Sequence, residues 1–225
     1  MPHEKTEFIE RGVILRTTNV RESDVMCSIL TEHHGKIAAA ARGAKRSKRR
    51  FPGGLQLFDC ARFTFVPPRH RFPGANHLHE IYSLNNLIER EVWSGLSGEL
   101  NRFISASVVI ETADVLSHEG DPQGSEMLDP LMRTLRALNT APTKLACTDL
   151  ANLFLFFCLR HAGFDPLSAK NHPAHLAEWL NDVSLTDLTI HEHSNSELTN
   201  STFLFLTRSV EEIVGRRYKS TSVSN

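Results

Sequence analysis

Two apolar runs, Ile37–Ala41 and Ala61–Val66, enclose the stretch Arg-Gly-Ala-Lys-Arg-Ser-Lys-Arg-Arg at residues 42–50. The second run alternates apolar side chains at 61, 63 and 65 with polar ones at 62 and 64, which is typical of a half-buried β-strand. A cationic loop held between two strands suits a polyanionic backbone, so we expect nucleic acid to be the partner. The seven basic residues between His33 and Phe58, where no acidic residue occurs, are Lys36, Arg42, Lys45, Arg46, Lys48, Arg49 and Arg50.

Short apolar or β-branched runs recur through the first eighty residues. We predict strands at Val13–Leu15, Val25–Leu30, Ile37–Ala41, Ala61–Val66 and Leu78–Leu84. Polar turn residues separate the first two runs, and a Gly-Lys pair marks a tight turn before the third. Five short strands with a long basic loop between the third and the fourth predict a small closed barrel such as the OB-fold.

The apolar period changes to that of helices after about residue 85. Stripes with spacings of three or four residues recur at 92–115, 128–138, 150–157 and 203–213. We therefore predict an α+β protein. An N-terminal five-stranded OB-fold β-barrel domain would span residues 1–84, and an all-helical C-terminal domain would span 85–225 with a frayed tail at 216–225.

Charge is divided unevenly along the chain. Residues 1–79 carry fourteen Lys or Arg and seven Asp or Glu, whereas residues 80–225 carry eleven and nineteen. This split favours two modules with the anion-binding face on the first, and chance clustering on a solvated surface is the alternative.

The four cysteines, Cys27, Cys60, Cys147 and Cys158, form no CxxC pair, and three of them lie in apolar segments. We interpret them as reduced core residues of a cytosolic protein. The N-terminus lacks the apolar stretch of a signal peptide, and no run approaches the roughly 18 residues that span a bilayer. We expect a cytoplasmic, nucleoid-associated protein without membrane contact.

Four pieces of the N-terminal part carry a family pattern in their order and spacing. They are Gly12-Val13-Ile14-Leu15-Arg16, Glu22-Ser23-Asp24, His34-Gly35-Lys36, and Ala41-Arg42-Gly43-Ala44-Lys45-Arg46-Ser47 with Gly54-Leu55-Gln56-Leu57-Phe58. Each is common by itself, but together, over about seventy residues, they resemble the bacterial recombination mediator RecO. The segment Leu159–Pro166 is similar to a helix end in that family.

The resemblance implies an N-terminal OB-fold followed by a helical domain. It also implies binding of single- and double-stranded DNA, annealing of complementary strands, and help in loading recombinase at gaps during DNA repair. The partners that it implies are RecR and the C-terminal tail of single-strand-binding protein. A basic residue beside an apolar groove would suit that acidic-hydrophobic tail; the candidates are Arg133, Arg136, Arg160 and Arg208.

Many members of that family hold zinc with two CxxC pairs in the part that corresponds to residues 167–200, where this chain has no cysteine. The family's zinc site is therefore absent or replaced. His172, His175, His191 and His193 have ligand-like spacing, but structural zinc sites usually contain thiolates, and scattered surface histidines are the simpler interpretation. We expect no cofactor.

The loop cations and Lys36 are the expected phosphate contacts, and Arg62, Arg69 and Arg71 could extend the track or be plain surface residues. Six contacts with single-stranded DNA would give a log–log salt slope of about −4, at roughly −0.7 each. An unstructured solvated loop or a nuclear-style address tract is the alternative. Phe51 could anchor the loop inward or stack on a base, whereas two strand aromatics, Phe63 and Phe65, fit a core.

Catalytic motifs are absent from the sequence. There is no Walker A sequence, no G-x-S-x-G elbow and no HExxH, so we expect a non-enzymatic DNA-binding protein. Two alternatives stay open: an RNA-binding OB-fold protein, and a metal-dependent hydrolase that uses histidines and carboxylates.

Overall fold

The computed structural model describes residues 6–68, 80–169, 172–174, 176–181, 183–184, 189–190 and 196–215. Two compact units emerge: Met1–Val92 with Ser117–Leu128, and Trp93–Leu116 with Asp129–Asn225. The domain boundary expected after residue 84 falls within a strand of the first unit, and that unit also includes a later segment of the chain.

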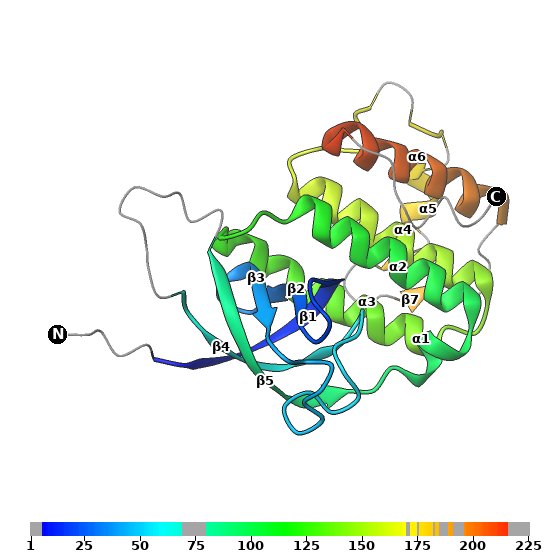
Figure 1. Cartoon of the computed structure of the whole chain (residues 1–225). Helices are drawn as coiled ribbons and strands as arrows, with labels where there is room; N and C mark the ends of the chain where they lie inside the picture. The colour runs from blue at the N-terminus through cyan, green and yellow to red at the C-terminus, as the bar shows by residue number, and fades with distance from the viewer. Residues whose placement is uncertain are drawn as a thin grey trace. The chain divides into compact units, whose positions relative to one another are not determined.

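A closed barrel of five strands forms the first unit (Figure 1). The strands are β1 (Phe8–Asn19), β2 (Val25–Thr31), β3 (Gly35–Ala41), β4 (Cys60–Val66) and β5 (Ile81–Glu91). They follow the order β1-β2-β3-β5-β4, with β3 and β5 parallel and the other paired strands antiparallel. The predicted α+β class with an N-terminal OB-fold barrel is confirmed.

The inward side chains of the barrel are apolar on every strand. Ile14, Ile29, Phe63 and Phe65 are each 0% exposed, and Leu84 joins them. The period-2 alternation of β4 therefore predicted its buried face correctly, and Phe63 and Phe65 are core residues as expected.

Strand β5 extends well beyond the predicted fifth strand, which covered residues 78–84. It runs from Ile81 to Glu91, and only Leu84 and Leu87 along it are buried. Polar residues between these leucines hide its period in the sequence. The pairing with β4 holds it extended through two register shifts, and Glu89 takes a left-handed backbone conformation with a φ of 52°.

The segment Ser117–Leu128 returns to the barrel and contains the short helix η2 (Pro122–Met127), which contacts β3 and β2. The Gly120 N–H donates to the Lys36 carbonyl across 3.2 Å. Gly35 has a φ of +63°, and a Cβ there would lie 1.9 Å from the carbonyl oxygen of Asp121. Only glycine allows this close approach of two backbones.

The second unit contains the helices α1 (Ser94–Gly98), α2 (Leu100–Leu116), α3 (Leu128–Thr140), α4 (Lys144–His161), α5 (Leu176–Asn181) and α6 (Ser196–Val214). Its core includes Val108 of α2, Leu155 and Leu159 of α4, and Leu206 and Val210 of α6. The short strands β6 (Val183–Ser184) and β7 (Thr189–Ile190) pair as well, so the described residues of this unit are not purely helical.

Helix α4 has clear stop and start signals. Thr143 caps its N-terminus by accepting a hydrogen bond from the Ala146 N–H, and Gly163, with a φ of +82°, follows its C-terminus. No helix in the described part of the chain is both long and apolar enough to cross a membrane.

None of the four cysteines forms a disulfide, and all four are buried. Burial raises the pKa of the Cys27 thiol to about 12 and that of the Cys147 thiol to about 11. The pKa of Cys158 is likewise raised by burial. These thiols are packed side chains, in agreement with the expectation of reduced core residues.

Candidate nucleic-acid interface

The basic loop, residues 42–59, connects β3 to β4 and has an ordered backbone. Arg46 and Ser47 donate their backbone N–H groups to the Gly43 carbonyl at 3.1 Å, and the Phe51 N–H donates to the Ser47 carbonyl at 3.0 Å. Gly43 starts this series of turns with a φ of +65°. The described loop is therefore a folded element, unlike the unstructured loop that was the alternative interpretation.

Phe51 anchors the basic loop to the barrel. Its side chain is 1% exposed and belongs to the barrel core together with Ala44, which is 3% exposed. Burying a phenylalanine removes a large apolar area from water, so the loop cannot lift off without losing this contact. The sequence left open whether Phe51 anchors the loop or stacks on a base. It anchors the loop, because a buried ring offers no face to a base.

Arg90 of β5 holds the second half of the loop. Its Nη1 donates to the Pro52 carbonyl at 2.8 Å, and its Nη2 donates to the Gly54 carbonyl and to Oδ2 of Asp59, the latter at 2.9 Å. Burial raises the pKa of Asp59, while the Gln56 N–H and the Arg90 guanidinium act in the opposite direction. The guanidinium thus satisfies two carbonyls and one buried carboxylate at once.

The β1–β2 turn, residues 20–24, holds the first half of the loop. The Gly43 N–H donates to Oδ1 of Asp24 at 2.8 Å, and the Lys45 N–H donates to the Ser23 carbonyl at 3.1 Å. These contacts join segments about twenty residues apart in sequence. The first turn and the basic loop consequently form one surface.

The loop cations differ in exposure and in their partners. Arg50 is half-buried and engaged within the loop: its Nε donates to the Ser47 hydroxyl at 3.1 Å and its Nη2 donates to the Arg42 carbonyl at 2.6 Å. Arg46 lies 3.3 Å from Glu22, in an ion pair exposed on both sides. The exposed cations of the loop are Arg42, Lys45, Arg46, Lys48 and Arg49.

The remaining predicted contacts lie apart from the loop or outside the described residues. Lys36 is 8% exposed, on β3 at the end where Ser117–Leu128 packs. Arg62 is exposed on β4, with its guanidinium 3.8 Å from Glu89 of β5. Arg69 and Arg71 fall outside the described residues.

Arg21 was not among the phosphate contacts predicted from the sequence. It is exposed in the β1–β2 turn, close enough to Asp24 to act on its carboxylate, as Arg42 also does. The signal was weak, because a single arginine beside Glu22 looks like ordinary turn material. The hydrogen bonds between turn and loop place it next to the loop cations.

Comparison with known proteins bears on this surface. Residues 5–73 match the family model described as recombination protein O N terminal, which covers β1 to β4 and the whole basic loop. The DNA repair protein RecO of Anaeromyxobacter dehalogenans is 32% identical over 155 residues, covering 69% of this chain and 56% of that protein. The RecO of Myxococcus xanthus is 30% identical over 166 residues, covering 71% and 60%.

The chain belongs to the RecO family. A more distant relative, the DNA repair protein RecO of Streptomyces coelicolor, is 28% identical over 139 residues, covering 60% of this chain and 55% of that protein. The matches thus span only somewhat more than half the length of these curated relatives.

The segment 167–200, for which the resemblance implies a zinc site in many family members, is described only in part. His172 is exposed, and its Nδ1 lies 2.8 Å from the Ala169 carbonyl. His175, His191 and His193 fall outside the described residues. Among the residues that the structure does describe, no group of three histidine, cysteine or acidic side chains could hold a metal ion.

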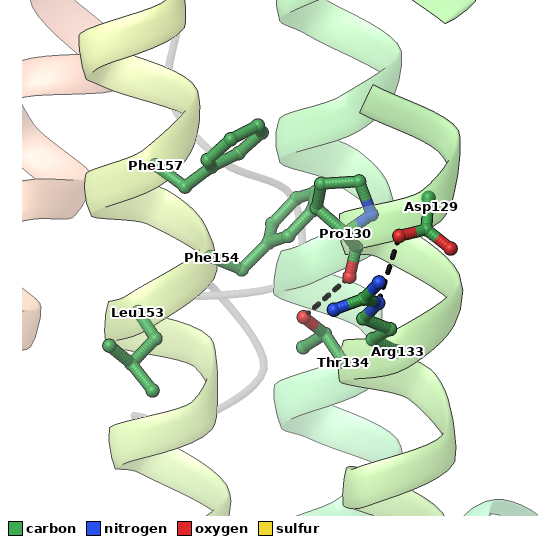
Figure 2. A pocket seen from close by; sticks show the side chains of 7 residues that line it. All are labelled: Asp129, Pro130, Arg133, Thr134, Leu153, Phe154 and Phe157. Atoms are coloured by element: carbon green, nitrogen blue, oxygen red, sulfur yellow. Dashed lines mark hydrogen bonds and ion pairs between the residues drawn. The ribbon is translucent and has the colours of Figure 1, made fainter. Parts of the chain in front are cut away.

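A second candidate site for this RecO-family chain lies between α3 and α4 (Figure 2). It is an open pocket of about 140 Å³ with an apolar base, and the guanidinium of Arg133 stands at its edge, 2.8 Å from Asp129. The other predicted arginines of this unit, at 136, 160 and 208, do not line it. The lining residues are Asp129, Pro130, Arg133, Thr134, Leu153, Phe154 and Phe157.

Proposed function

We propose that this chain is a non-enzymatic recombination mediator that binds single- and double-stranded DNA through its basic loop and anneals complementary strands. The observation that carries this proposal is a row of exposed cations on a loop fixed at three places: by Phe51, by Arg90 and by the β1–β2 turn. A fixed row of cations meets a phosphate backbone at a smaller entropic cost than a mobile loop would.

Charge neutralisation gives a physical route to annealing. Two strands repel each other through their phosphates, and a cationic surface that holds both removes much of that repulsion. No nucleotide cofactor is needed for this step. In the cytoplasm, such a protein would help to load recombinase at single-stranded gaps.

The salt dependence of binding tests the proposal. Arg42, Lys45, Lys48 and Arg49 have exposed side chains without a described ion pair, so four phosphate contacts and a log–log slope of about −3 are expected at roughly −0.7 per contact. This value is smaller than the six-contact value because Arg50 is engaged within the loop and Arg46 lies beside Glu22.

Replacement of Lys45, Lys48 and Arg49 by Gln should bring the slope to about −0.7 and suppress annealing of complementary oligonucleotides. Replacement of three exposed cations of the second unit by Gln removes the same charge and should leave the salt slope and annealing nearly unchanged. The three are Lys144, Arg160 and Arg208. Equal loss in the two triple variants would refute the loop as the binding surface. Tighter binding of an RNA strand of the same sequence would favour the RNA-binding alternative.

The pocket between α3 and α4 supports one protein partner. We propose that it receives the C-terminal tail of single-strand-binding protein, with an apolar side chain against the half-buried Phe157 and a carboxylate on Arg133. Arg133→Glu should abolish binding of a labelled acidic-hydrophobic peptide, and Arg160→Glu should not. Retained binding in the first variant would exclude this pocket.

RecR is the other proposed partner, on the strength of the family alone. Co-elution of the two purified proteins tests it. The loop variant that cannot bind DNA should still co-elute if the RecR contact lies elsewhere on the chain.

A further inference from the structure

Asp24 occupies an unfavourable place for a DNA-binding surface. Its carboxylate lies among cations, within reach of the guanidinium groups of Arg21 and Arg42. A negative charge there repels phosphate and weakens the attraction of its neighbours. If the surface acted by charge alone, DNA affinity would be higher without Asp24.

The hydrogen bonds of Asp24 indicate what it does instead. Oδ1 accepts from the Gly43 N–H at 2.8 Å and lies 3.3 Å from the Ser23 hydroxyl, while the backbone carbonyl of Asp24 accepts from the Val20 N–H at 3.2 Å. The Gly43 hydrogen bond, with smaller contributions from Ser23, Arg21 and Arg42, holds the pKa of Asp24 below its usual range. The carboxylate is therefore ionised at neutral pH and accepts a charge-assisted hydrogen bond.

Gly43 is the point at which this contact has the most effect. It lies two residues after the end of β3, has a φ of +65°, and its carbonyl accepts the two N–H groups that form the first turn of the loop. Two residues later the Lys45 N–H is held by the Ser23 carbonyl. The turn thus fixes the backbone on both sides of Ala44, and with it the directions of Arg42 and Lys45.

We propose that Asp24 is a positioning residue of the DNA-binding surface, which holds the first turn of the basic loop so that Arg42 and Lys45 face the same strand. This inference rests on the proposed DNA binding by the loop. The β1–β2 turn then contributes to DNA binding by holding the loop in place. An anionic side chain in this turn raises the affinity for an anionic ligand.

The sign of the effect makes the inference testable. Asp24→Ala and Asp24→Asn remove the same negative charge, but only asparagine keeps an oxygen that can accept from the Gly43 N–H. We expect Asp24→Asn to bind a single-stranded oligonucleotide at least as tightly as the unchanged chain. Asp24→Ala should bind about fivefold to tenfold more weakly than Asp24→Asn, with a salt slope shallower by about 1.4, the equivalent of two contacts.

Two further variants separate charge from position. Glu22→Gln removes a charge from the same turn, where Glu22 is exposed and pairs with the Arg46 side chain, and it should tighten binding slightly. Asp24→Glu keeps the charge and shifts the carboxylate by one methylene, so it should bind more weakly than the unchanged chain. Asp24→Glu also tests the positioning role if Asp24→Ala fails to fold.

Hydrogen exchange at the Gly43 and Lys45 amides reports the contact without DNA. Both should exchange at least tenfold faster in Asp24→Ala, while the barrel strands keep their protection. Unchanged exchange, or equal DNA affinity of Asp24→Ala and Asp24→Asn, would overturn the positioning role. Absence of DNA binding by the unchanged chain would instead refute the proposed function, whatever the exchange data show about the loop.

Discussion

Removal of the Arg90 guanidinium should destabilise the barrel unit more than removal of the exposed Arg62 guanidinium. The Asp59 side chain is 8% exposed and that of Arg90 is 21% exposed, so neither is well screened by water. Loss of one partner of a buried ion pair costs about 3–5 kcal/mol, because the other charge stays buried without compensation. The partial exposure of Arg90 places the expected cost of Arg90→Met at the lower end, about 3 kcal/mol.

Arg62→Met is the matched control. Arg62 and its partner Glu89 are 50% and 66% exposed and lie 3.8 Å apart, and such surface pairs contribute about 0–1 kcal/mol. Hydrogen exchange of the slowest amides of β1 and β4 gives the free energy of unfolding of the barrel unit by itself. It is the suitable assay because a chain of two units need not unfold in one step.

The loss of stability in Arg90→Met should depend on pH in a definite direction. Burial raises the folded-state pKa of Asp59, so its contribution to stability is fully present below the unfolded-state pKa and is lost as pH rises through the folded-state value. Without Arg90 that pKa rises further. The deficit of Arg90→Met should therefore be smaller at pH 5 than at pH 8, and Asp59→Asn should recover part of it. A deficit below about 0.5 kcal/mol at pH 8 would refute the reasoning.

Three other substitutions or treatments have definite expected outcomes. Phe51→Ala should destabilise the barrel unit by about 3–5 kcal/mol in the same exchange assay, since the ring is fully buried, and a loss under 1 kcal/mol would show that the loop anchor is dispensable. Cys27, whose pKa is raised to about 12, has a thiolate fraction on the order of 10⁻⁴ at pH 8; iodoacetamide should modify it only after denaturation, as mass spectrometry of native and urea-treated chain can establish. Gly35→Ala should increase amide hydrogen exchange across Ser117–Leu128, because the new Cβ collides with the carbonyl of Asp121. An unchanged exchange pattern in this segment would contradict that packing.

The sequence predicted the barrel because the evidence for strands is local. Alternation in Ala61–Val66 and the apolar runs of β2 and β3 mark one buried face each, and side chains in a strand alternate with a period of two whatever the partner. The position of the basic loop between the third and fourth strands followed from the same pattern. Strand β5 was predicted too short because its polar residues break the alternation and only pairing with β4 keeps it extended.

The helical unit shows the same limit of local patterns. The stripe of α4 predicted a helix ending near Gly163, as observed. Asp149 and Asn152 of that helix are nevertheless fully buried, where they meet Thr199 of α6 through hydrogen bonds of 2.9 and 3.0 Å. From the sequence alone, such a polar pair predicts an exposed helix face, because the helix that buries it is not known.

By itself, the sequence determined that this chain has a five-stranded barrel, a cationic loop and a helical part, since composition and period act over a few neighbouring residues. Only the tertiary structure decided which cations are exposed. Lys36 is buried on β3 where Ser117–Leu128 packs and Arg50 donates to the loop backbone, whereas Arg21 joins the loop through a contact between residues 24 and 43. The reason is that the partner of a side chain depends on segments brought together by folding, and no local pattern records them.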